Sequence, residues 1–206
     1  MSDRRRLARR LSACEPFAEP RVDLEQYPTP SEIAAELVHT AGLQGDLAGE
    51  TVVDLGTGTG VLALGAACRG PDRVLGVDCD RAALSIAREN AARVDPDAPV
   101  HWIQSDARHP GIRGPATVLS NPPFGAQSGS EHADREFLAT TAAIATVSYT
   151  IHNAGSESFV RSFVADHDGR VTHAWETSFP IDRQFDFHDA DRRAIPVEIY
   201  RIFWRD

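Results

Sequence analysis

Short apolar runs alternate with amphipathic segments along most of the chain. Continuous apolar or β-branched runs predict buried strands, and apolar residues three or four apart predict helices. The predicted strands are 51–55, 73–77, 100–104, 117–120, 147–152, 170–179 and 197–204, and the predicted helices among them are 61–69, 80–93, 134–146 and 156–167. This order indicates an α/β fold with a doubly wound, mostly parallel sheet. The last two strands, with no helix between them, suggest an antiparallel finish.

Two more helices are predicted before the first strand. Residues 3–13 place Leu7 and Leu11 four apart, as on one helix face. The second helix runs to about residue 41, with Thr29 as N-cap, Pro30 in the first turn and Glu32 as the capping-box partner. At 206 residues we expect a single domain, residues 1–206, with an extension in 1–50 and a Rossmann-like core in 51–206.

Composition predicts a soluble cytoplasmic protein, with 42% hydrophobic and 25% charged residues. The longest apolar run, 61–68, is too short for a bilayer, and no apolar segment follows the N-terminal arginines as a signal peptide requires. Cys14, Cys68 and Cys79 contain no C-x-x-C pair. They predict a reducing compartment, without a disulfide framework or a zinc site of the chain's own.

The charge pattern is unusual, because the net charge is -9 and every basic residue is an arginine. Adaptation to a salty cytoplasm would explain it, and so would a genome rich in G and C. An acidic chain is also an unusual nucleic-acid binder. RNA binding would therefore need arginines gathered at the rim of the site, for which the candidates are Arg4, Arg5, Arg6, Arg9 and Arg10, and, near the C-terminus, Arg192 and Arg193.

A glycine-rich turn follows the first predicted core strand, with the sequence Asp54-Leu-Gly-Thr-Gly-Thr-Gly-Val61. Glycines let a backbone approach a ligand closely, although such a turn alone is typical of many Rossmann-like proteins. The nicotinamide fingerprint needs its third glycine one position after Gly60.

Carboxylates end the next two predicted strands, Asp78 and Asp106. Asp78 is placed to accept from ribose hydroxyls and Asp106 from an adenine amino group. Singly, such aspartates order turns or cap loops. Together with Asp54, at the end of the first core strand, they flank one glycine loop and predict a cofactor site, and their charge suits a cationic sulfonium cofactor.

The fourth core strand ends in Asn121-Pro122-Pro123-Phe124. Neither proline donates a backbone N–H, so this loop offers acceptors and suits a ligand that brings N–H groups. Phe124 supplies a face on which a planar ring stacks. The plain alternative is an Asn-Pro turn that closes a strand.

These motifs resemble those of the class I S-adenosylmethionine-dependent amino-methyltransferases. The segment Leu24-Glu-Gln-Tyr-Pro-Thr29, together with Tyr149-Thr-Ile-His152 and Val197-Glu-Ile199, resembles the methyltransferase-like protein 5 family and its archaeal relatives. The resemblance implies a seven-stranded sheet in the order 3-2-1-4-5-7-6. It also implies S-adenosylmethionine as cofactor and methylation of N6 of one adenosine in small-subunit ribosomal RNA.

The resemblance also implies residue roles. Gln26 and Thr29 would contact the methionine end of the cofactor, Asp78 its ribose and Asp106 its adenine. The cofactor loop would consist of Gly56, Gly58, Thr59, Gly60 and Val61, and the target base would be held by Asn121, Pro122, Pro123 and Phe124. Eukaryotic members carry a lysine-rich stretch before the last strand, where this chain has only two arginines in 186–193.

Three other functions fit the same residue chemistry. An Asn-Pro-Pro-aromatic loop suits a glutamine amide in a protein or a DNA base as well as RNA, and a cofactor-binding scaffold without catalysis stays open.

A protein partner is suggested by the predicted edge strand Val100–Gln104. Its Trp102 and Ile103 point to opposite faces, and one of them would be exposed unless a helix covers that face. The resemblance implies a small zinc-binding activator subunit, which would form a heterodimer along this edge.

Overall fold

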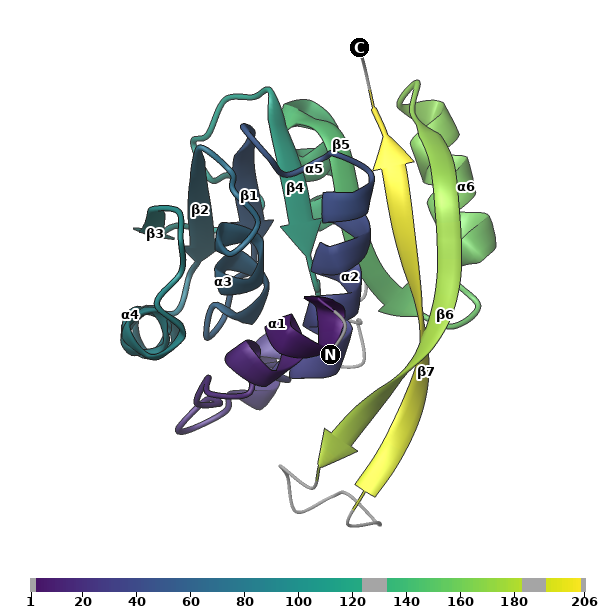
Figure 1. The fold of residues 1–206 in the computed structure, drawn as a ribbon. Helices are drawn as coiled ribbons and strands as arrows, with labels where there is room; N and C mark the ends of the chain where they lie inside the picture. Colours follow the sequence, from purple (N-terminus) through teal and green to yellow (C-terminus); the bar gives the residue numbers. More distant parts are fainter. Residues whose placement is uncertain (1–2, 124–132, 183–191, 205–206) are drawn as a thin grey trace.

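A single seven-stranded sheet forms the centre of the protein, in a computed structural model that describes residues 3–123, 133–182 and 192–204. The strand order is β3-β2-β1-β4-β5-β7-β6, as predicted (Figure 1). The pairings from β3 across to β5 are parallel, whereas β7 runs antiparallel to both β5 and β6. The strands are β1 (Thr51–Leu55), β2 (Arg73–Asp78), β3 (Val100–Gln104), β4 (Ala116–Ser120), β5 (Ala145–Asn153), β6 (Arg170–Asp182) and β7 (Arg192–Phe203).

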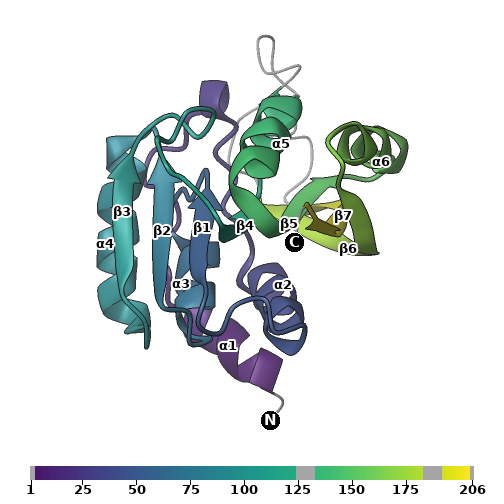
Figure 2. The same cartoon turned by 90° about the horizontal axis from the view of Figure 1, so that it is seen from above.

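Helices cover both faces of the sheet (Figure 2). One face carries α1 (Asp3–Leu11), α2 (Ser31–Leu43), α3 (Val61–Ala67) and α4 (Arg81–Val94), and the other carries α5 (Ala133–Ile144) and α6 (Glu157–Asp166). Two hydrophobic cores result, one under each helical layer. All of β4 and all of β1 except Thr51 are buried, because both strands are covered on both sides, which explains why their sequences read as largely apolar runs.

The last two strands are longer than predicted. The pairing of β7 with β5 ends at Asn153 and Val197, but β7 stays paired with β6 as far as Asp182 and Arg192. The hairpin therefore projects past the carboxyl end of β5 (Figure 1). The polar stretch 182–193, for which the sequence suggests a loop, belongs to β6 and β7 at its two ends, and residues 183–191 lie outside the described residues. Another boundary also moved, because β5 starts at Ala145, inside the predicted helix 134–146, where it pairs with β4.

The predicted capping box of α2 is wrong. The helix starts at Ser31, so that Pro30 occupies the N-cap position, and no side chain caps it. The Thr29 hydroxyl instead accepts a hydrogen bond from Asn121 Nδ2 across the site, at 3.1 Å. Asp80, the first residue of the predicted helix 80–93, caps α4, because its carboxylate accepts from the backbone N–H of Ala82.

The edge strand β3 does not expose a large apolar side chain. Trp102 and Ile103 are both partly buried, each packed against a different core. The Trp102 ring fills space beside two glycines, since a Cβ at Gly76 would lie 2.6 Å from it and one at Gly60 2.7 Å. Of the two outcomes that the sequence left open, the covered one therefore holds: α3 and α4 contact β3, and Ile103 packs into the second core. Among the described residues, no helix is long and apolar enough to cross a membrane.

Candidate active site

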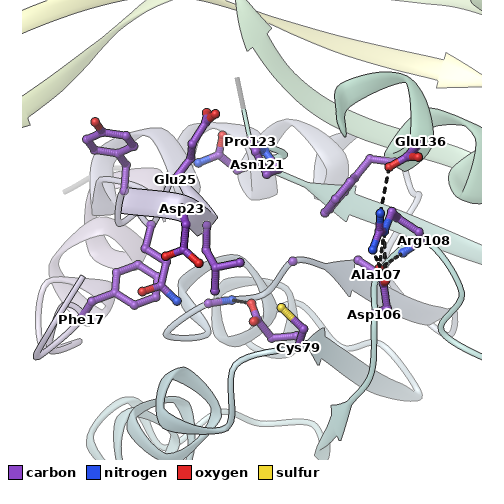
Figure 3. A pocket seen from close by; sticks show the side chains of 17 residues that line it. Phe17, Asp23, Glu25, Cys79, Asp106, Ala107, Arg108, Asn121, Pro123 and Glu136 are labelled. Carbon is purple, nitrogen blue, oxygen red and sulfur yellow. Dashed lines mark hydrogen bonds and ion pairs between the residues drawn. The ribbon is translucent and has the colours of Figure 1, made fainter. Parts of the chain in front are cut away.

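A pocket of about 610 Å³ opens at the carboxyl ends of the parallel strands (Figure 3). The segment between α1 and α2 contributes one wall, the strand-end loops a second and the first turn of α5 a third. A smaller cavity of about 40 Å³ adjoins it and shares Phe17, Tyr27, Gly56, Gly58 and Asn121 with it. In doubly wound sheets, this edge is where ligands bind.

The glycine loop requires its glycines. Gly56, Gly58 and Gly60 have positive φ values of 71°, 53° and 88°, where other residues are strained. Two aromatic rings also lie against it, because a Cβ at Gly56 would be 3.0 Å from Phe137 and one at Gly58 2.8 Å from Phe17. Gly56 and Gly58 line both cavities, so a ligand there can approach their backbone closely.

Asp54 is buried beneath this loop, with 1% of its surface exposed. One carboxylate oxygen accepts from the Thr57 hydroxyl at 2.6 Å and from the Ala63 N–H at 2.9 Å. The other oxygen, Oδ1, is buried and has no partner within the described part of the chain. Burial raises the pKa of Asp54 to about 7. Asp54 lines the smaller cavity, and in its ionised form this oxygen can accept from a ligand that brings N–H groups.

Asp78 lies at the end of β2, on the wall of the larger pocket. Its two oxygens accept from the backbone N–H groups of Gly58 and Asp80, both at 2.8 Å. Burial raises its pKa. Each carboxylate oxygen retains a lone pair for a further donor, so the predicted contact with ribose hydroxyls remains a prediction that this geometry allows.

Asp106 is held by an arginine that the sequence reading did not single out. Arg108 Nε lies 2.9 Å from both Asp106 oxygens, and its Nη1 lies 3.4 Å from Glu136 Oε2 on α5 (Figure 3). The hydrogen bond from Arg108 lowers the pKa of Asp106. Asp106, Arg108 and Glu136 form an ion-paired wall after the end of β3. In the sequence, the signal for the Asp106–Arg108 pair is an arginine two residues after an aspartate.

Asn121 stands where β4 ends and lines both cavities. Its Nδ2 donates to Thr29, while its Oδ1 is buried and without a partner in the described ranges. Pro122 is buried and Pro123 lines the larger pocket. Phe124 falls outside the described residues.

The segment 12–30 is tied to the site at two points. Gln26 accepts from the Arg21 N–H at 2.9 Å and donates to Asp80 at 2.7 Å, which places its side chain near Asp78. The sequence reading missed Asn90 on α4, which is fully buried and exchanges hydrogen bonds with the Glu15 backbone.

Asn90 also supports the glycine loop, because it donates to the Thr59 carbonyl at 2.9 Å. Thr59 and Val61 are themselves buried, and both line the smaller cavity. An asparagine on the inner face of a helix is the sequence signal for such a tie, since a buried amide needs partners.

The arginines of α1 are largely engaged within the chain. Arg4 pairs with Glu36 at 3.6 Å, Arg6 with Asp3 at 2.6 Å and Arg10 with Asp97 at 3.2 Å. These exposed pairs weaken the positive potential that an RNA-binding patch needs, so the predicted patch stays a prediction. The side chains of Arg192 and Arg193 are outside the described set.

Comparison with known proteins gives one matching family and several relatives of nearly full length. Residues 33–150 match the family described as Methyltransferase small domain. An uncharacterized protein of Methanocaldococcus jannaschii is 35% identical over 98% of this chain and 94% of its own length. The Drosophila melanogaster protein named rRNA N(6)-adenosine-methyltransferase Mettl5 is 30% identical over 96% of this chain and 95% of its own.

A solved structure is also similar over the full length. A protein from Pyrococcus horikoshii superposes with a TM-score of 0.88, is 37% identical and covers all of both chains.

Proposed function

This chain belongs to the small-domain methyltransferase family, in the branch that contains the METTL5 proteins, and from that premise we propose that it methylates N6 of an adenosine in ribosomal RNA. The observation that carries the proposal is Asn121, which lines the pocket and whose buried Oδ1 has no partner among the described residues. An exocyclic amine brings the N–H donors that such an oxygen lacks.

The residues present fit the cofactor, S-adenosylmethionine. Asp54 Oδ1 is buried and finds no partner in the part of the chain that the structure describes, and as a carboxylate oxygen it suits the ammonium group of the methionine end. Asp78 would hold the ribose hydroxyls and Asp106 the adenine amino group. The glycine loop would let the cofactor pass close to the protein backbone. When bound, the cofactor supplies an electrophilic methyl group on a sulfonium sulfur.

The target amine is a weak nucleophile, because its lone pair is delocalised into the purine ring. The Asn121 oxygen and the Pro122 carbonyl would hold its two N–H bonds and so turn the lone pair toward the methyl group. The amine becomes cationic as the bond forms, and that acidic cation loses its proton to water without a general base. The base must leave its stack to reach the pocket.

The finer assignment is an adenosine of small-subunit ribosomal RNA, acted on in the cytoplasm. The similarity to Mettl5 over nearly the full length supports ribosomal RNA as the substrate, and the small subunit and the cytoplasm are taken from the resemblance of the sequence motifs. The proposed RNA contacts are the arginines of α1, together with Arg192 and Arg193 at the start of β7. Charge reversal at Arg5 and Arg9 should weaken RNA binding at matched salt and leave the melting temperature unchanged. If the variant and the wild type bound RNA with equal affinity in a filter-binding assay, α1 would not be part of the RNA-binding surface.

A small zinc-binding activator subunit is proposed as the partner, paired along β3. Its support is that β3 is the edge strand of the sheet, with one side of its backbone ladder unpaired within the described residues. Co-purification from the native host tests it. A monomer that is fully active and stable at low salt would exclude an obligate heterodimer.

Transfer of labelled methyl from S-adenosylmethionine to separated RNA, DNA and protein fractions, followed by nucleoside analysis, tests the function. We expect N6-methyladenosine in ribosomal RNA from the wild type. Asn121→Ala should reduce the rate by at least about a hundredfold, the usual effect of losing a group that stabilises the transition state. Asn153→Ala, at the end of β5, is the matched control and should keep the wild-type rate. Label only in protein or DNA would reject the proposal.

A further inference from the structure

Thr29 and Asn121 meet across the site although 92 residues separate them in the chain. Thr29 precedes α2, and Asn121 follows β4. The Asn121 Nδ2 donates to the Thr29 hydroxyl oxygen at 3.1 Å, and both residues line the smaller cavity. This contact also explains why Thr29 does not cap α2.

The direction of this hydrogen bond decides what Asn121 presents to the pocket. A hydroxyl has one proton to donate and lone pairs with which to accept, and an amide has a donor end and an acceptor end. When Thr29 accepts, the amide oxygen is left for the ligand, as in this structure. If Thr29 donated to that oxygen, the amide N–H₂ would face the ligand. An amide N–H₂ donates, so it cannot hold the N–H groups of the target amine, which need an acceptor.

A bound carboxylate would settle the direction. Because Thr29 accepts from Asn121, its own proton is available for an acceptor in the smaller cavity. A carboxylate there accepts only, and hydrogen bonds to charged groups are the stronger ones. With its proton committed to the carboxylate, the hydroxyl can only accept from the amide.

We infer that Thr29 is a positioning residue that sets the orientation of the Asn121 amide, and that the cofactor's carboxylate locks this relay. The inference rests on the proposed function, since it takes the cofactor's methionine end to lie beside Thr29. Cofactor binding then prepares the acceptor for the target amine before the base arrives. Recognition of the amine and occupancy of the cofactor site are thereby coupled.

The amide itself is the direct readout. The chain has three asparagines, Asn90, Asn121 and Asn153, so protein labelled with ¹⁵N at asparagine gives three side-chain N–H₂ signals. Asn121→Asp identifies the relevant one.

Thr29→Val should shift that signal to the position of an amide without a hydrogen bond, whereas Thr29→Ser should retain it. Thr40→Val, nine residues from the start of α2, is the matched control and should leave it unchanged. An Asn121 signal that is the same in wild type and Thr29→Val would overturn the inference.

Two ligands test the role of the carboxylate. S-adenosylhomocysteine carries it, whereas 5′-methylthioadenosine lacks the amino-acid end. We expect slower hydrogen exchange of the Asn121 N–H₂ protons with the first ligand alone. Equal protection by both at saturation would show that the carboxylate does not lock the relay.

Kinetics at saturating cofactor supply the third readout. Thr29→Val should lower kcat by about tenfold in the wild-type background and have no further effect in Asn121→Ala, because one residue acts through the other. Losses that multiply would overturn the inference. If the wild type methylates no RNA, the proposed function fails, and the spectra still decide whether Thr29 orients the amide.

Discussion

Burial of Asp54 makes the stability of the free enzyme depend on pH in an unusual direction. Burial raises the pKa of this carboxyl from 3.8 to about 7. Between these values, the folded state keeps a proton that the unfolded state has lost. The free energy of unfolding should therefore fall as the pH rises through this window, and stay at its lower value above pH 7.

The size of the effect follows from the same two values. The full window corresponds to about 4 kcal/mol, and the part between pH 5 and pH 8 to about 3 kcal/mol. Asp54→Asn cannot titrate. Its amide oxygen can still accept from Thr57 and Ala63, as Asp54 does. A constant loss of stability in this variant does not matter, because the quantity compared is the change between the two pH values.

Urea denaturation at pH 5 and pH 8 measures this change. We expect the wild type to lose about 3 kcal/mol more than Asp54→Asn on going to pH 8. Asp166→Asn, at the exposed end of α6, is the matched control and should follow the wild type. Subtracting the Asp54→Asn curve from the wild-type curve removes the contribution of titrating groups that do not interact with Asp54. Parallel curves for wild type and Asp54→Asn would refute a buried, protonated Asp54.

Three further changes test the architecture of the site. Asp78→Ala should weaken cofactor binding by about 1.5–3 kcal/mol in calorimetry through lost hydrogen bonds to a charged group, and unchanged affinity would mean that Asp78 does not hold the ribose. Gly60→Ala should lower the melting temperature, because φ is 88° and the new Cβ would lie 2.7 Å from Trp102; an unchanged value contradicts that contact. Asn90→Ala should speed proteolysis within residues 12–30, and resistance equal to wild type would show that the segment is held by other contacts.

The sequence by itself determined the sheet and the positions of most site residues. The apolar runs that become β1 and β4 and the capping aspartate of α4 are local signals, readable within a few residues. Carboxyl ends of parallel strands meet at one edge. The order of strands was therefore enough to bring Asp78, Asp106 and Asn121 to the wall of one pocket.

Only the tertiary structure decided which partner each polar or aromatic side chain finds. Thr29 fits a capping box locally, yet its hydroxyl bonds to Asn121. Trp102 lies on an edge strand, where the sequence alone allows it to be exposed, yet its ring fills the space that Gly60 and Gly76 leave open. Asn90 lies on the inner face of α4, which signals a buried amide, but nothing near it in the sequence says that its partners are the Glu15 and Thr59 carbonyls. Local hydrogen bonds, such as a helix cap, compete with contacts that form only after the sheet and helices have packed. A buried polar group bonds to whichever partner that packing brings within hydrogen-bond distance.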